Sequence, residues 1–139
     1  MGRRAMGVCL LGLALLLTAA AQTIKKTPVP YTSPASGKEM YVSYCAACHG
    51  ADGKGHGPAA PALNTVPTDL TALQARHGGK FPGDYVNSVL AGKTELAAHG
   101  SVDMPVWGPI FRKLGKGSSA EIQLRITNLT SYLESMQGK

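Results

Sequence analysis

Two cysteines and a histidine stand close together in the run Cys45-Ala46-Ala47-Cys48-His49. Residues three apart lie on one face of a helix, one turn apart, so both thiols can reach the same bound group. The C-x-x-C-H spacing is that of covalent haem attachment, in which two thiols add across the two vinyl groups on one haem edge. The imidazole of His49 then lies under the porphyrin and can bind the iron from one side. The sequence therefore predicts one covalently bound haem c.

A C-x-x-C pair also occurs as a thioredoxin-like redox pair, as half of a zinc site, or as a plain disulfide. The histidine that follows directly and an export signal argue against all three uses. At the N-terminus, Arg3 and Arg4 precede an apolar run over residues 8–17, and an Ala-x-Ala cleavage site follows at residues 19–21. We therefore expect residues 1–21 to be a cleavable signal peptide, and the protein to be exported to the periplasm of a Gram-negative-type bacterium.

Cleavage after residue 21 leaves a chain of 118 residues, enough for one domain with a modest core. Cys9 leaves with the signal, so both remaining cysteines belong to the C-x-x-C-H motif. Arg3 and Arg4 also leave, which reduces Lys and Arg from 14 to 12 against 8 Asp and Glu, a formal charge of +4. A mildly basic protein without a basic helix or stripe suits an acidic protein partner and not nucleic acid. The alternative is an uncleaved anchor, although residues 8–21 fall short of the about 20 that a membrane span needs.

The exported chain divides into a linker and a helical domain. Residues 22–35 carry three prolines and little apolar periodicity, which predicts a flexible linker, and we expect the domain to cover residues 36–139. Caps and apolar spacing predict helices at residues 36–48, 68–75 and 81–91, and a last helix between the capping-box pattern at 118–121 and Gly138. Because no stretch alternates with period two, the predicted fold class is all-α.

A second iron ligand decides what such a haem can do. An open position allows ligand binding or peroxidase chemistry, whereas a strong, unreactive ligand leaves electron transfer. The candidates are the methionines and histidines outside the motif, namely Met40, Met104, Met136, His56, His77 and His99. Met40 shares the first expected helix with the motif, and Met136 completes the apolar stripe of the last one. Met104 has no such explanation and is the first candidate, with His99, five residues earlier, as its rival.

These motifs resemble those of class I cytochromes c, specifically the small exported bacterial type with one haem. The resemblance covers about residues 36–137 and rests on Gly37-x3-Tyr41-x3-Cys45, the C-x-x-C-H motif, Pro61-Ala62-Leu63, and Met104-Pro105-Val106-Trp107-Gly108. It implies the cytochrome c fold, in which four to five short helices wrap around the haem. The first and last helices would cross, with Gly37 and Tyr41 at the crossing.

The resemblance also implies roles for single residues, with thioethers at Cys45 and Cys48, His49 as the proximal ligand and Met104 as the distal ligand. Pro61, 12 residues after His49, would accept the imidazole N–H through its carbonyl. Trp107 would pack on the haem edge or reach a propionate.

The implied function is one-electron transfer by a soluble carrier that is not an enzyme. Its partners would be redox proteins of the dehydrogenase or oxidase type, and it would meet a membrane only through a partner complex or an uncleaved anchor. Two alternatives stay open: a cytochrome subunit of a larger redox complex, and a ligand-binding or peroxidatic haem protein.

Overall fold

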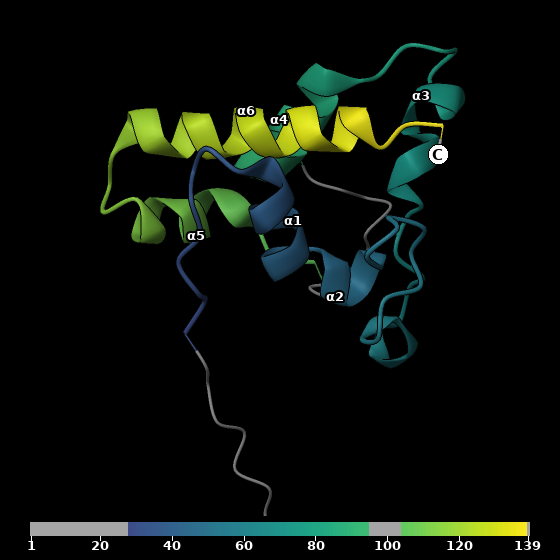
Figure 1. Cartoon of the computed structure of the whole chain (residues 1–139), viewed down its shortest axis with the longest axis horizontal. Coiled ribbons are helices and arrows are strands. Elements are labelled where there is room, and N and C mark those ends of the chain that lie inside the picture. The colour runs from purple at the N-terminus through teal and green to yellow at the C-terminus, as the bar shows by residue number, and fades with distance from the viewer. Residues whose placement is uncertain (1–27, 95–103, 139) are drawn as a thin grey trace, which may run out of the picture.

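The structure is a computed structural model that describes residues 28–94 and 104–138. The expected signal segment and His99 lie outside the described residues. The elements in chain order are α1 (Gly37–Tyr44), α2 (Ala46–His49), the 3₁₀ turns η1 (Ala60–Ala62) and η2 (Leu70–Ala72), α3 (Leu73–Arg76), α4 (Gly83–Ala91), α5 (Trp107–Leu114) and α6 (Ser119–Ser135). No strand occurs in these two stretches, and the expected all-α fold is confirmed. Figure 1 shows α6 lying across the domain, with α1 and α5 beneath it.

Helices α1 and α6 cross at a glycine. A Cβ atom on Gly37 would lie 2.1 Å from the carbonyl oxygen of Asn128 and 2.7 Å from the Cβ of Tyr132. One turn further along α1, the ring of Tyr41 is fully buried and lies 5.4 Å from that of Tyr132. The crossing of the first and last helices is confirmed, and the backbone at Asn128 is the partner of Gly37.

Helix α6 has the boundaries that its local sequence predicts. The Ser118 hydroxyl accepts a hydrogen bond from the backbone N–H of Glu121 at 3.3 Å, which satisfies a free donor of the first turn. The apolar stripe behind this cap is buried, at Ile126, Leu129, Leu133 and Met136. Met136 is thus a core residue, as expected.

Two helices differ from the expectation. The first helix does not run unbroken over residues 36–48, because α1 ends at Tyr44 and α2 starts only after Cys45. The C-x-x-C-H motif therefore forms a separate helical turn, which ends at Gly50 with φ +81°. The structure also contains a helix that the sequence analysis does not predict, α5. Its apolar residues at 107, 110, 111 and 114 follow helical spacing.

The proline-rich segment before α1 is attached to the domain. Thr32 is only 2% exposed, and its Oγ1 accepts a hydrogen bond from the Arg125 guanidinium at 3.1 Å. The side-chain amide of Asn128 donates to the carbonyl of Pro34 at 2.9 Å. An extended proline-rich backbone leaves its carbonyls without backbone partners, and half-buried side chains of the helices supply donors to them. Residues 30–34, which the prediction assigned to the linker, are therefore packed against the helices.

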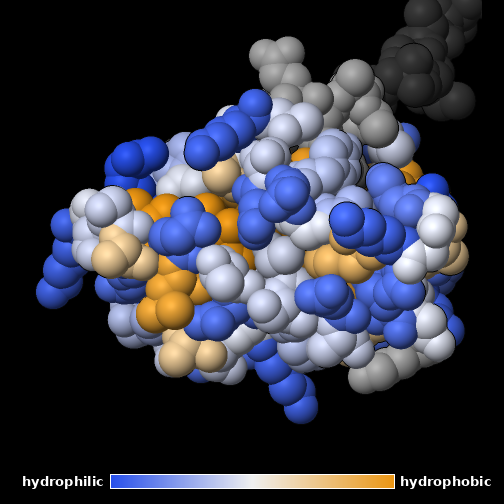
Figure 2. Space-filling model, turned by 90° about the horizontal axis from the view of Figure 1, so that it is seen from above, coloured by the Kyte–Doolittle hydropathy of each residue, from blue (hydrophilic) through white to orange (hydrophobic). Residues whose placement is uncertain are grey.

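The surface seen from above in Figure 2 is mostly hydrophilic, with apolar patches between the charged side chains. Within residues 28–94 and 104–138, no helix has the length and apolar character needed to cross a bilayer.

Candidate functional site

The glycine-rich loop after α2 folds back on the motif. Backbone N–H groups of Gly55, Gly57 and Ala59 donate to the carbonyls of residues 49, 48 and 47 at 2.8, 3.0 and 2.8 Å. These carbonyls end a helix and have no partner within it. A Cβ on Gly57 would lie 2.4 Å from the carbonyl oxygen of Ala47, so only glycine allows this approach. The loop thereby fixes the end of α2 and with it His49.

The His49 imidazole is buried, 7% exposed, and its Nδ1 lies 2.9 Å from the carbonyl oxygen of Thr68. A carbonyl only accepts, so Nδ1 carries the proton in this contact and Nε2 is the basic nitrogen of the ring. A hydrogen bond from the far nitrogen of a ligand imidazole to a carbonyl orients the ring and raises the basicity of the other nitrogen.

This contact corrects the role expected for Pro61. Pro61 is exposed on the turn η1 and does not line the pocket that contains His49. Residues 67–70 lie beside the imidazole instead, because they pack against the glycine loop. The N–H of Leu70 donates to the carbonyl of Gly53 at 2.7 Å, and a Cβ on Gly55 would lie 2.2 Å from the Pro67 oxygen.

Asp69 gives this return segment its local shape. Its carboxylate accepts from both the backbone N–H and the hydroxyl of Thr71, at 2.8 and 2.7 Å, and so caps η2. The hydrogen bond from the Thr71 hydroxyl is the main cause that lowers the pKa of Asp69 below its ordinary value. The sequence signal for this arrangement is the run Pro67-Thr68-Asp69, where the local pattern predicts only the start of a helix.

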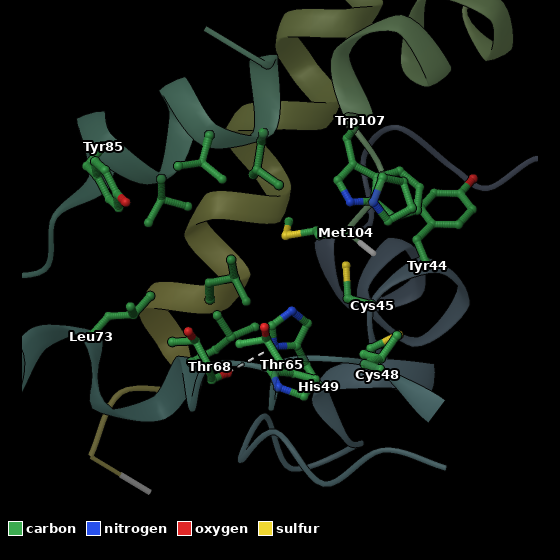
Figure 3. A pocket seen from close by; sticks show the side chains of 18 of the residues that line it. Tyr44, Cys45, Cys48, His49, Thr65, Thr68, Leu73, Tyr85, Met104 and Trp107 are labelled. Carbon is green, nitrogen blue, oxygen red and sulfur yellow. Dashed lines mark hydrogen bonds between the residues drawn. The ribbon is translucent and has the colours of Figure 1, made fainter. Parts of the chain in front are cut away.

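An apolar pocket of about 270 Å³ lies between His49 and the segment that leads into α5. Its lining includes Tyr44, Cys45, Cys48, His49, Leu63, Thr65, Pro67, Thr68, Leu70, Leu73, Arg76, His77, Tyr85, Val86, Val89, Leu90, Met104, Pro105, Trp107 and Leu133. Figure 3 shows Met104 on the far side of the pocket from His49, with Cys45 and Cys48 along one edge. Five of the six expected site residues thus line one pocket, and Pro61 does not.

Among the other candidate ligands that the structure describes, all but one lie outside the pocket. Met40 and Met136 are core residues, and His56 is exposed on the loop after α2. The exception is His77, which lines the pocket. Its Nδ1 lies 2.7 Å from the carbonyl of Leu73, and its ring lies 6.2 Å from that of Tyr85.

Met104 is positioned by the tight start of α5. A Cβ on Gly108 would lie 2.4 Å from the carbonyl oxygen of Ala91, and a Cβ on Gly92 would lie 2.3 Å from Val106. The segment before α5 therefore rests directly on the end of α4. On its other side, the buried Trp107 ring stacks on Tyr44, with 5.2 Å between centroids and 27° between planes.

The side chains of Cys45 and Cys48 are partly buried and form no disulfide with each other. Burial, and to a lesser extent the nearby charge of Cys48, raises the pKa of the Cys45 thiol to about 12. Catalytic thiols of redox pairs show the opposite shift, because the thiolate is their reactive form. The Cys45 thiol therefore does not have the environment of the reactive thiol in a thioredoxin-like site.

The residues of this pocket fit a haem attached at the motif. Apolar walls suit the porphyrin faces, two thiols lie along one edge, and an imidazole and a thioether lie on different sides. In the comparison with known proteins, no curated protein and no solved structure matches the chain. The family model for Cytochrome c matches residues 34–106, more than half of the chain and inclusive of the motif and Met104. That family carries covalently attached haem c, and Cys45, Cys48 and His49 have the arrangement that this attachment requires. The chain belongs to the cytochrome c family.

Proposed function

We propose that this protein is a soluble one-electron carrier whose haem iron is held by His49 and Met104. The observation that carries the proposal is the placing of both side chains in one apolar pocket, across from each other, with the two thiols along its edge (Figure 3). Membership of the cytochrome c family supports haem-based electron transfer. The covalent haem supplies a one-electron iron couple, and a thioether ligand raises its reduction potential.

The polypeptide contributes a rigid pair of ligands. The Thr68 carbonyl fixes the ring of His49, and the end of α4 together with Trp107 fixes the backbone beside Met104. Ligands that stay in place in both oxidation states keep the reorganisation that accompanies electron transfer small. A sixth position filled by sulfur also excludes small molecules, which separates a carrier from a peroxidatic enzyme.

We propose that redox partner proteins of the dehydrogenase or oxidase type dock near the pocket. Three exposed apolar side chains, Val66, Tyr85 and Val106, belong to the pocket lining or adjoin it in sequence. Five cationic side chains are also exposed, namely Lys54, Lys93, Arg112, Lys113 and Lys116. A small apolar contact on a mildly basic protein suits a transient complex with an acidic partner surface.

We further propose that the carrier works in the periplasm after removal of residues 1–21. This part of the proposal rests on the N-terminal sequence alone. Cell fractionation and the intact mass of the purified protein test it, because cleavage leaves a chain that begins at Gln22. Recovery with the membrane, or with a stable complex, would instead favour an anchored cytochrome or a subunit of a larger redox complex.

The ligands are tested by absorption spectra of the ferric protein. We expect a c-type spectrum with the weak far-red sulfur-to-iron charge-transfer band, and we expect Met104→Ala to abolish that band. Met136→Leu is the matched control, since Met136 is a buried methionine of the core and should leave the band unchanged. Absence of the band from the wild-type protein would contradict methionine ligation and direct attention to His99 or to an open iron.

A further inference from the structure

Arg125 is the most deeply buried charged side chain among the described residues and lies outside the haem pocket. It is fully buried, and its guanidinium donates to the carboxylate of Glu121 at 2.8 and 3.1 Å. The central carbon of the guanidinium, Arg125 Cζ, lies 4.9 Å from the ring centre of Tyr31 and 6.0 Å from that of Phe111. Burying an arginine is costly unless every donor is used, so its remaining contact is informative.

That contact leads to the N-terminal segment 30–34, here called the strap. Arg125 Nη1 donates to Thr32 Oγ1 at 3.1 Å, Thr32 Oγ1 lies 2.7 Å from the Tyr44 hydroxyl, and that hydroxyl donates to the carbonyl of Pro30 at 2.7 Å. The Tyr44 hydroxyl has one proton, which it donates in the hydrogen bond to the Pro30 carbonyl. The Thr32 hydroxyl must therefore donate to Tyr44 while it accepts from Arg125. The chain of hydrogen bonds has one direction, and Thr32 is its central member.

The strap thus acts on the wall of the haem pocket. Tyr44 lines the pocket beside Cys45, and its ring stacks on Trp107. Trp107 is the first residue of α5 and follows Met104 by three positions. The end of α4 lies directly against Gly108, and the Tyr44 ring packs on Trp107, so a shift of Tyr44 removes one of the contacts that hold the start of α5.

We propose that the strap holds Met104 on the iron by bracing the Tyr44–Trp107 pair, with Thr32 and Arg125 as its positioning residues. This inference rests on the proposed His49 and Met104 ligation. A molecule that competes for the sixth position binds only while Met104 is displaced. Its affinity therefore reports the population of the displaced state, and a brace present only in the closed state lowers that affinity.

Imidazole binding to the ferric holoprotein, followed by loss of the far-red band, tests the brace. Thr32→Val keeps the side-chain shape but removes both hydrogen bonds of the central hydroxyl. We expect it to raise the imidazole affinity about fivefold, the factor that corresponds to one net hydrogen bond of ~1 kcal/mol. Thr32→Ser restores the hydroxyl and should bind imidazole as the wild type does.

Thr130→Val is the matched control. Thr130 is also buried, 8% exposed, and donates to the Asn87 side chain at 2.6 Å, between α6 and α4 and outside the strap. The Thr130→Val variant loses a buried hydroxyl just as Thr32→Val does, and we expect its affinity for imidazole to stay at the wild-type value. Equal affinities for the Thr32→Val and Thr130→Val variants would overturn the strap.

Tyr44→Phe tests the same chain of hydrogen bonds from its other end. It still tests the proposal if Thr32→Val does not fold. It removes the hydroxyl but keeps the ring on Trp107, and the same rise in affinity is expected; no rise would overturn the proposal. A wild-type protein without the far-red band would overturn methionine ligation and the strap together. A wild-type protein with the band, but with variants that bind imidazole no better, would overturn the strap alone.

Discussion

Replacement of Gly37 by alanine gives a test of the fold in which the sign of the effect is informative. Alanine is the better helix former by about 1 kcal/mol, so the exchange should stabilise an unobstructed helix. In this structure the new methyl group would lie 2.1 Å from the carbonyl oxygen of Asn128 and 2.9 Å from its carbon. Both atoms are backbone of α6 and cannot rotate away, so one helix must move.

The size of the effect follows from these distances. Overpacking a well-packed core costs roughly 1–3 kcal/mol, and contacts with immobile backbone belong at the upper end of that range. After subtraction of the propensity gain, we expect Gly37→Ala to lower the free energy of unfolding by about 2 kcal/mol. For a domain of this size, that corresponds to a fall in Tm of about 8–16 °C.

Gly83→Ala is the matched control, because Gly83 is the first residue of α4 as Gly37 is of α1, and neither has a positive φ. A Cβ on Gly83 would meet its nearest atoms at 3.8 and 4.0 Å, which is ordinary contact. We expect this variant to be stabilised by up to ~1 kcal/mol. Thermal unfolding of the ferric holoproteins, followed by far-ultraviolet circular dichroism, measures both. A Gly37→Ala protein as stable as the wild type would refute the close crossing.

Two further substitutions test hydrogen bonds around the motif. Tyr41→Phe removes the buried hydroxyl that donates to the Gly50 carbonyl at 2.6 Å. We expect this to lower the free energy of unfolding, measured in urea, by about 1–3 kcal/mol. A loss below ~0.5 kcal/mol would contradict the importance of this hydrogen bond. Asp69→Asn tests the cap of η2. Because the pKa of Asp69 is depressed in the folded protein, its contribution exists above the unfolded value of 3.8 and is lost as the pH falls below it. The variant should therefore be less stable than the wild type near neutral pH, and the two urea unfolding curves should converge below pH 3.8; a difference that does not depend on pH would show that the carboxylate charge contributes nothing.

The sequence predicted those elements whose signals are local. The boundaries of α6 follow from the Ser118 cap and the apolar stripe behind it, and α4 ends before Gly92 as expected, which has φ +73°. The C-x-x-C-H spacing was sufficient for the covalent haem. The crossing at Gly37 and Tyr41, which the resemblance to class I cytochromes c implies, is also present.

The features that the sequence did not predict depend on contacts between distant residues. Thr68 reaches His49 only because the glycine loop holds residues 67–70 beside it, which the spacing from His49 to Pro61 does not reveal. The attachment of the proline-rich segment depends on Arg125, 93 positions after Thr32. Arg125 is a charged residue beside the apolar stripe of α6, so the sequence alone predicts that it is exposed to solvent. The break at Cys45 likewise has no helix-breaking residue to mark it.

The ¹H NMR spectrum of the reduced holoprotein tests the central claim, ligation by His49 and Met104, most directly. A methionine methyl group held over a porphyrin face experiences a strong ring current, so one three-proton resonance should appear far upfield. We expect this resonance to be absent from Met104→Leu and present in Met40→Leu, since Met40 is a core residue. A wild-type spectrum without such a resonance, or one that persists in Met104→Leu, would contradict the assignment of Met104 to the iron.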